Sequence, residues 1–89
     1  MARLHISAVL RELHEVPADL DLEAASVAEL FVALRAAHPA AAVWFDEDGS
    51  LVEWLTLFLD GVELTHPPEP STPLAADADL DLLAHAAGG

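Results

Sequence analysis

The chain has 89 residues, 54% of them hydrophobic, and contains no cysteine, so we predict one domain whose core is supported by neither disulfides nor cysteine-bound metal. Sixteen acidic residues, three arginines and no lysine give a formal charge of −13. This charge disfavours nucleic acid and anionic membranes and favours a partner with a basic surface, unless the acidity only maintains solubility or reflects a saline cytoplasm.

The N-terminal part of the chain predicts two strands. Residues 1–5 run straight into alternating sequence without the apolar core of a signal peptide, and no apolar run reaches the roughly 18 to 20 residues that span a bilayer. We therefore predict a cytoplasmic protein. Alternating apolar residues predict a strand over 3–10 and a second strand over 14–23, joined by a polar turn. Pro17 places the second strand at an edge or a bulge.

A helix follows these strands. Ser26-Val27-Ala28-Glu29 predicts a capping box, in which the Ser26 hydroxyl accepts from the backbone N–H of Glu29 and the Glu29 carboxylate accepts from the N–H of Ser26. The helix is expected to continue to about Ala37, because Pro39 disfavours helical geometry at His38. One apolar stripe at helical spacing is formed by Val27, Leu30, Phe31 and Leu34.

The remaining elements complete a small sheet. Residues 40–45 predict a short helical turn that buries Trp44 or Phe45, and an acidic turn over 46–50 leads to a strand over 51–59. Asp60-Gly61 favours a type I′ hairpin into a strand over 62–64. Four prolines within 66–73 predict an extended surface loop. A loose turn over 74–79 and a last strand over 80–85 follow.

This order of elements predicts an α+β fold of the β-grasp type. We expect a mixed four- to five-stranded sheet with one main helix packed across one face. Residues 1–85 form the single domain, and residues 86–89 form a flexible C-terminal tail.

The residue pattern does not support catalysis or metal binding by this chain. The internal glycines, Gly49 and Gly61, each follow an aspartate in a turn rather than forming a phosphate-binding loop. No serine lies in a G-x-S-x-G motif, and the five histidines share no metal-ligand spacing.

On strand 51–59, Trp54 and Phe58 fall on the face opposite the core, which predicts a partner-binding surface unless loop 66–73 covers them.

The chain ends in Ala86-Ala87-Gly88-Gly89. Glycine lacks Cβ, so the last two residues can enter a narrow channel. The Gly89 carboxylate then sits on an unhindered acyl carbon that another enzyme could reach. The alternative is a tail without a role, because chain ends are commonly disordered.

Several segments together resemble the ubiquitin-like sulfur carriers of the ThiS/MoaD type. The first strand with Val9-Leu10-Arg11-Glu12-Leu13 resembles the opening of the molybdopterin-synthase small subunit. Ser26–Leu30 followed by His38-Pro39 resembles the family's helix and its end. Leu57–Gly61 resembles the family's hairpin, and Thr72–Leu74 resembles the segment that leads to its last strand. The terminal Gly88-Gly89 matches the functional signature of that family.

The resemblance implies a carrier rather than an enzyme, although the chain could be the small subunit of a sulfurtransferase complex. A ubiquitin-activator-like partner would use ATP and magnesium to adenylate Gly89, and a sulfur donor would convert it to a thiocarboxylate. A second enzyme would accept the sulfur. Gly88 would give flexible access to the terminus, and the expected partner-binding residues are Trp54, Phe58, Ala86 and Ala87. The acceptor could be a precursor of molybdopterin, thiazole, cysteine or a natural product. The alternatives are a modifier joined through Gly89 to lysines of other proteins and a non-reactive acidic adaptor.

Overall fold

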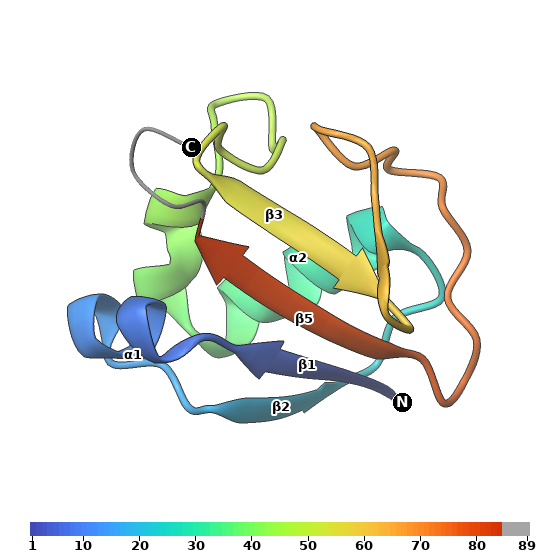
Figure 1. Cartoon of the computed structure of the whole chain (residues 1–89), viewed down its shortest axis with the longest axis horizontal. Helices are drawn as coiled ribbons and strands as arrows, with labels where there is room; N and C mark the ends of the chain where they lie inside the picture. Colours follow the sequence, from blue (N-terminus) through green and yellow to red (C-terminus); the bar gives the residue numbers. More distant parts are fainter. Residues whose placement is uncertain (85–89) are drawn as a thin grey trace.

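Two layers, a mixed sheet and a helical layer, make up the fold. The computed structural model describes residues 1–84, apart from the side chains of residues 13 and 14. The sheet has the strand order β2-β1-β5-β3-β4, and helix α2 crosses one of its faces (Figure 1). The α+β β-grasp prediction is therefore confirmed. The elements are β1 (Ala2–Ile6), α1 (Ala8–His14), β2 (Asp19–Leu22), α2 (Val27–Ala37), the 3₁₀ helix η1 (Pro39–Trp44), β3 (Leu55–Leu59), β4 (Val62–Glu63) and β5 (Asp79–Ala84).

The centre of the sheet joins the two ends of the chain. Strand β5 pairs with β1 in parallel, with Leu4 beside Leu80, and with β3 in antiparallel, with Leu57 beside Leu82. The antiparallel pairs β1–β2 and β3–β4 complete the two edges. The last described strand therefore lies in the middle of the sheet, between the first strand and β3 (Figure 1).

Helix α2 forms where the sequence predicted it, but only half of the predicted capping box is present. Ser26 Oγ accepts from the backbone N–H of Glu29 at 3.2 Å. The Glu29 carboxylate accepts from the N–H of Ala25 at 3.0 Å, instead of from that of Ser26. The helix ends at Ala37, and the N–H of His38 donates to the Leu34 carbonyl at 2.9 Å, as Pro39 led us to expect.

The predicted strand over 3–10 is wrong beyond Ile6. Strand β1 ends there, and α1 begins after Ser7. Ile6 and Leu10 are both buried, and a spacing of four suits a helix as well as a strand. Ala8 distinguishes the two patterns, because a continued strand would bury it and it is exposed. The polar turn predicted over 11–14 is accordingly the second half of this helix.

Two other strands are shorter than predicted. Strand β2 begins at Asp19 instead of residue 14, and Pro17 lies before it. Strand β3 begins at Leu55 because residues 53–54 form a turn, in which the N–H of Leu55 donates to the Val52 carbonyl at 3.1 Å. Leu51 is buried like the inward leucines of β3, so the apolar period continues through the turn and conceals it.

The hairpin between β3 and β4 has the predicted turn. Asp60 and Gly61 have φ values of 49° and 84°, and positive φ at both central residues defines type I′. Asp60 also ties the hairpin to β5, because its N–H donates to the Asp79 carbonyl at 2.7 Å and its carboxylate accepts from the Asp79 N–H at 3.0 Å.

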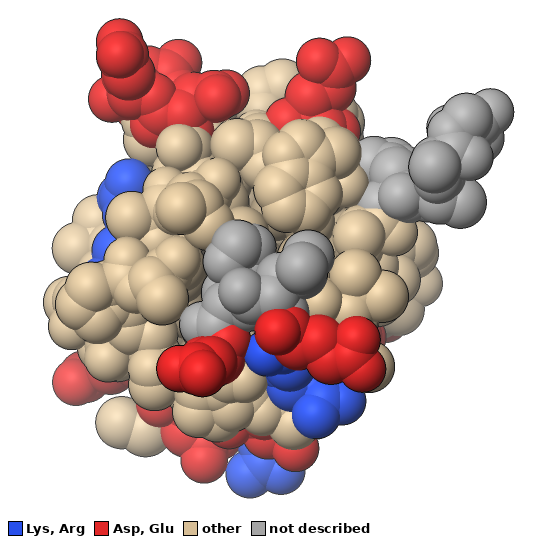
Figure 2. All heavy atoms as spheres, turned by 90° about the vertical axis from the view of Figure 1, so that its left-hand side faces the viewer, with Lys and Arg blue, Asp and Glu red and all other residues tan. Residues whose placement is uncertain are grey.

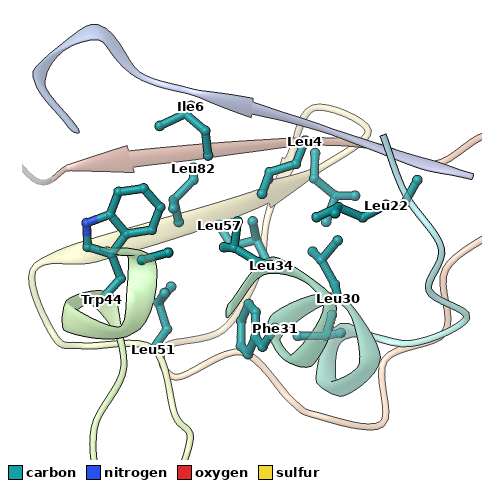
Figure 3. Close-up of a cluster of buried hydrophobic side chains, with 14 of the residues drawn as sticks. Leu4, Ile6, Leu22, Leu30, Phe31, Leu34, Trp44, Leu51, Leu57 and Leu82 are labelled. Atoms are coloured by element: carbon teal, nitrogen blue, oxygen red, sulfur yellow. The ribbon is translucent and has the colours of Figure 1, made fainter. Parts of the chain in front are cut away.

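The core lies between the sheet and the helical layer. In Figure 3, leucines of β1, β3 and β5 point toward Leu30, Phe31 and Leu34 of α2. Trp44, at the end of η1, is fully buried in the same cluster, whereas the adjacent Phe45 is half-buried. The prediction that one of these two aromatics would be buried is therefore confirmed for Trp44.

Two positions of α2 test this assignment of faces. Leu34→Ala should lower the free energy of unfolding by about 2–5 kcal/mol, because it leaves a cavity under the sheet. Val32→Ala is the matched control: its side chain is 60% exposed, so the change should stay within about 0.5 kcal/mol. Urea unfolding at neutral pH measures both values. Equal losses in the two variants would contradict the orientation of α2.

Candidate functional site

The face of the sheet opposite α2 carries Phe58, one of the predicted docking residues. Figure 1 looks onto this surface, which we call the open face, with α2 behind the strands. The strand registers give it a charged half on β2, β1 and the start of β5, and an apolar half on β3 and the end of β5. The two halves meet along β5.

The charged half is held by ion pairs between strands. Arg3 donates from Nε to Asp21 at 3.1 Å, which links β1 to β2. His5 contacts Asp19 of β2 through Nδ1 and Asp79 of β5 through Nε2, the second at 2.6 Å. Cross-strand pairs of opposite charge stabilise a sheet and fix its register. His5 has no metal-ligand spacing in the sequence, and the two carboxylates that reach it are brought there by the strand register.

The apolar half contains Phe58 and Leu83. Phe58 lies beside Asp81 of β5 and Glu63 of β4, and Leu83 lies beside Thr56. Leu83 is 39% exposed, whereas Phe58 is half-buried and thus less accessible than predicted. The sequence analysis missed Leu83. The signal was the alternation in β5, in which the outward positions read Asp, Asp and then Leu.

Trp54 is exposed, but it does not lie on a strand as predicted. It occupies the turn just before β3, and 45% of it is accessible. Loop 66–73, the predicted alternative cover, is instead hydrogen-bonded to the start of α2. The N–H groups of Val27 and Ala28 donate to the carbonyls of Thr72 and Pro70, each at 3.0 Å. Trp54 is therefore available to a partner, next to the strand that carries Phe58.

The described part of the chain ends on β5, beside the start of β3. Ala84, the last described residue, pairs with Leu55 at the start of β3, and this end of β5 lies close to the turn that contains Trp54. Ala86, Ala87, Gly88 and Gly89 lie outside the described residues, as does the predicted tail 86–89 that they form. The sequence prediction of a reactive carboxylate on Gly89 therefore remains a prediction.

Carboxylates dominate the charged surface. Figure 2 shows the side of the molecule that carries α1 and η1, where acidic residues gather above and below a largely uncharged area and fewer basic residues border it. Among the described side chains, which exclude those of residues 13, 14 and 85–89, no group of three or more His, Cys, Asp or Glu could hold a metal ion. None of the helices within residues 1–84 is long and apolar enough to cross a membrane.

The topology, the single main helix and the central C-terminal strand define the ubiquitin-like β-grasp fold. No protein-family model matches the sequence, and no curated protein resembles it closely. Solved structures do match. The chain is similar to a chain of the BexX/CysO complex of Amycolatopsis orientalis (TM-score 0.82, 15% identity, all of both chains) and to CysO of Mycobacterium tuberculosis (TM-score 0.79, 12% identity, 97% of this chain and 100% of that chain).

A third similar structure is SAMP1 of Haloferax volcanii, with a TM-score of 0.74 and 25% identity over 99% of this chain and 98% of that one. The alignments cover nearly the whole of each protein, so the likeness concerns the entire domain. The resemblance to the ThiS/MoaD type that the sequence suggested is thus confirmed by fold.

The two tryptophans provide a direct test of this surface. Trp44→Phe leaves Trp54 as the only indole, and Trp54→Phe leaves Trp44. We expect fluorescence of the Trp44→Phe variant to be strongly quenched by iodide and red-shifted, because Trp54 is 45% exposed and Trp44 is fully buried. The Trp54→Phe variant should resist quenching. Similar quenching in both variants would contradict the exposed position of Trp54.

Proposed function

We propose that the chain is a carrier protein whose C-terminal Gly89 is activated by a partner enzyme and converted to a thiocarboxylate that donates sulfur in a biosynthetic reaction. One observation carries the proposal: a ubiquitin-like β-grasp domain whose central strand β5 leads, within a few residues, to Gly88-Gly89. The domain supplies a docking surface and an unhindered acyl terminus, and the partners supply catalysis.

The chemistry takes place at one carboxylate. A Gly89 oxygen attacks the α-phosphorus of ATP, which forms an acyl adenylate and releases pyrophosphate. Sulfide then attacks the acyl carbon and expels AMP, which leaves sulfur in place of one oxygen. A persulfide on a partner instead gives an acyl disulfide, and a second thiol of that partner cleaves its S–S bond, forming a disulfide within the partner and releasing the thiocarboxylate. ATP and magnesium belong to the activating enzyme, and this chain binds neither. The five residues after Ala84 span at most roughly 17 Å at ~3.3 Å per residue, which suffices to enter a buried site. ATP-dependent activation agrees with a cytoplasmic location.

The apolar half of the open face is the proposed docking surface for these enzymes. Leu83 lies on β5, from which the chain continues into the tail. Phe58 lies on the neighbouring strand β3, and Trp54 precedes that strand. Carboxylates of Glu63 and Asp81 lie beside Phe58. The matching partner surface has an apolar centre and a rim of arginine or lysine. The same acidity disfavours nucleic acids and anionic membranes as partners.

The second candidate is a protein modifier, in which a lysine amine of a target protein, instead of sulfur, displaces AMP from Gly89. It is supported by the similarity to SAMP1. The SAMP1 of Methanosarcina acetivorans is described as a small archaeal modifier protein, and this chain is similar to it with 23% identity and a TM-score of 0.77. The third candidate is an acidic adaptor whose Gly-Gly is incidental. Only the first two candidates require Gly89.

Intact mass spectrometry of the protein from its native host separates these candidates. The carrier should show a population heavier by the difference between one sulfur and one oxygen atom. A variant lacking Gly89 should lose this species and all sulfur transfer, because the glycine-ended acyl group is gone. Purification under denaturing conditions tests the modifier, which would give covalent ladders of the chain with other proteins. Sulfur transfer that persists without Gly89 would refute the carrier.

The docking surface makes a separate prediction about the activating enzyme. Trp54→Ala should weaken binding at least tenfold, as loss of an exposed aromatic anchor commonly does, while Val32→Ala on α2 serves as a matched control without effect. Raising the salt concentration should also weaken binding, because ions screen the carboxylate rim. Isothermal titration calorimetry measures both effects. Equal affinities for the Trp54→Ala and Val32→Ala variants would place the docking surface elsewhere.

A further inference from the structure

The charged half of the open face contains a histidine that contacts two carboxylates from two different strands. His5 lies in β1, opposite Asp19 of β2 in the strand register and next to β5. Its Nδ1 contacts Asp19 Oδ1, and its Nε2 lies 2.6 Å from Asp79 Oδ1. Both ring nitrogens therefore contact a carboxylate, and together they link β1 to its two neighbours in the sheet, β2 and β5.

This arrangement requires a proton. A neutral imidazole has one N–H donor and one lone pair, whereas the imidazolium has two donors. An ionised carboxylate only accepts hydrogen bonds. When His5 is neutral, one of the two carboxylates faces a lone pair at hydrogen-bond distance, which is repulsive. When His5 is charged, both contacts become charge-assisted hydrogen bonds, which are about twice as strong as neutral ones.

The neighbouring charges favour the protonated form. From β2, Asp19 and Asp21 face this part of the sheet, and from β5 Asp79 and Asp81 do so. Arg3, on the same strand as His5, is the other cation and is paired with Asp21. Carboxylates therefore remain in excess around His5 even when it is charged. The His5 side chain is 34% exposed and the side chains of Asp19 and Asp79 are 62% and 56% exposed, so solvent screens part of these interactions.

We propose that His5, Asp19 and Asp79 form a proton-dependent clasp that fastens β2 and β5 to β1 across the open face. The clasp is closed while His5 is an imidazolium. Loss of the proton removes one of the two donors and so frees the side chain of either Asp19, at the start of β2, or Asp79, at the start of β5, while the backbone pairing of both strands remains. The proposal concerns the domain alone and does not depend on the chemistry at Gly89.

The direction of the pH dependence follows from the contacts. The hydrogen bond to Asp19, and then that to Asp79, raise the pKa of His5 above its ordinary value of 6.5, against the smaller opposing effect of burial. A group whose pKa is higher in the folded state stabilises the fold fully below its unfolded pKa. That stability is lost as the pH rises through the folded pKa. The clasp therefore opens on the alkaline side of pH 6.5.

An NMR titration of the full chain tests the clasp directly. The pKa of His5 should lie above 6.5 in the wild type and fall toward that value in both Asp19→Asn and Asp79→Asn, more so in Asp19→Asn. Asp21→Asn is the matched control, because Asp21 lies on the same strand and face but pairs with Arg3. This control should leave the pKa of His5 above 6.5. A wild-type pKa at or below 6.5, or equal effects of all three variants, would overturn the proposal.

Thermal unfolding gives a second, independent readout. His5→Gln should have a lower melting temperature than the wild type at about pH 6, because the amide replaces two charge-assisted bonds. The difference should shrink steadily as the pH rises through the folded pKa of His5, because the wild-type clasp then opens. In Asp21→Asn the melting temperature should retain the wild-type dependence over this range. A difference between His5→Gln and the wild type that stays constant with pH would show that His5 contributes by packing alone.

Discussion

The parallel pairing of β1 with β5 is the contact on which the rest of the fold depends. These strands come from opposite ends of the chain, with Leu4 beside Leu80, so all other elements must lie between them in sequence and around them in space. Strand β2 adds to the free edge of β1 and β3 to the free edge of β5. Helix α2 then covers the leucines that this pairing brings to one face. Without the central pair, neither the core nor the open face would have a continuous surface.

Strand β5 links stability to the proposed function through simple alternation. Leu80 and Leu82 point into the core, while Asp79, Asp81 and Leu83 point to the open face. Because side chains alternate along a strand, a shift of one residue would exchange these two sets. The packing of the inward leucines therefore also fixes where the outward aspartates meet His5 and where Leu83 meets the apolar half. The strand that ends at the tail is thereby positioned by the core.

The sequence predicted those elements whose signals are local. Ser26 and Pro39 delimit α2, and Asp60-Gly61 specifies the turn between β3 and β4. Both signals are local, because capping and positive φ depend on neighbouring residues alone. Helix α1 and the true start of β3 were not predicted. Residues four apart, such as Ile6 and Leu10, lie on one face of a helix and also on one face of a strand, so the apolar pattern did not distinguish the two. The apolar and charged halves of the open face depend on strand order and register, which arise from contacts distant in sequence. Trp54 was found because the alternation along 51–59 placed it opposite the core leucines, whereas the partners of His5 are supplied by two other strands.

The central parallel pair also determines how the domain responds to force. A partner that holds the N-terminal end of β1 and draws the tail away from the end of β5 pulls two parallel neighbours in opposite directions along their length. The interstrand hydrogen bonds from Arg3–Asp79 to Ile6–Leu82 then share the tension in shear, instead of separating one after another as in a peeling edge strand. Tension on the end of β5 is thus borne in shear by all of these hydrogen bonds, and the domain stays folded under a pull that would peel off an edge strand.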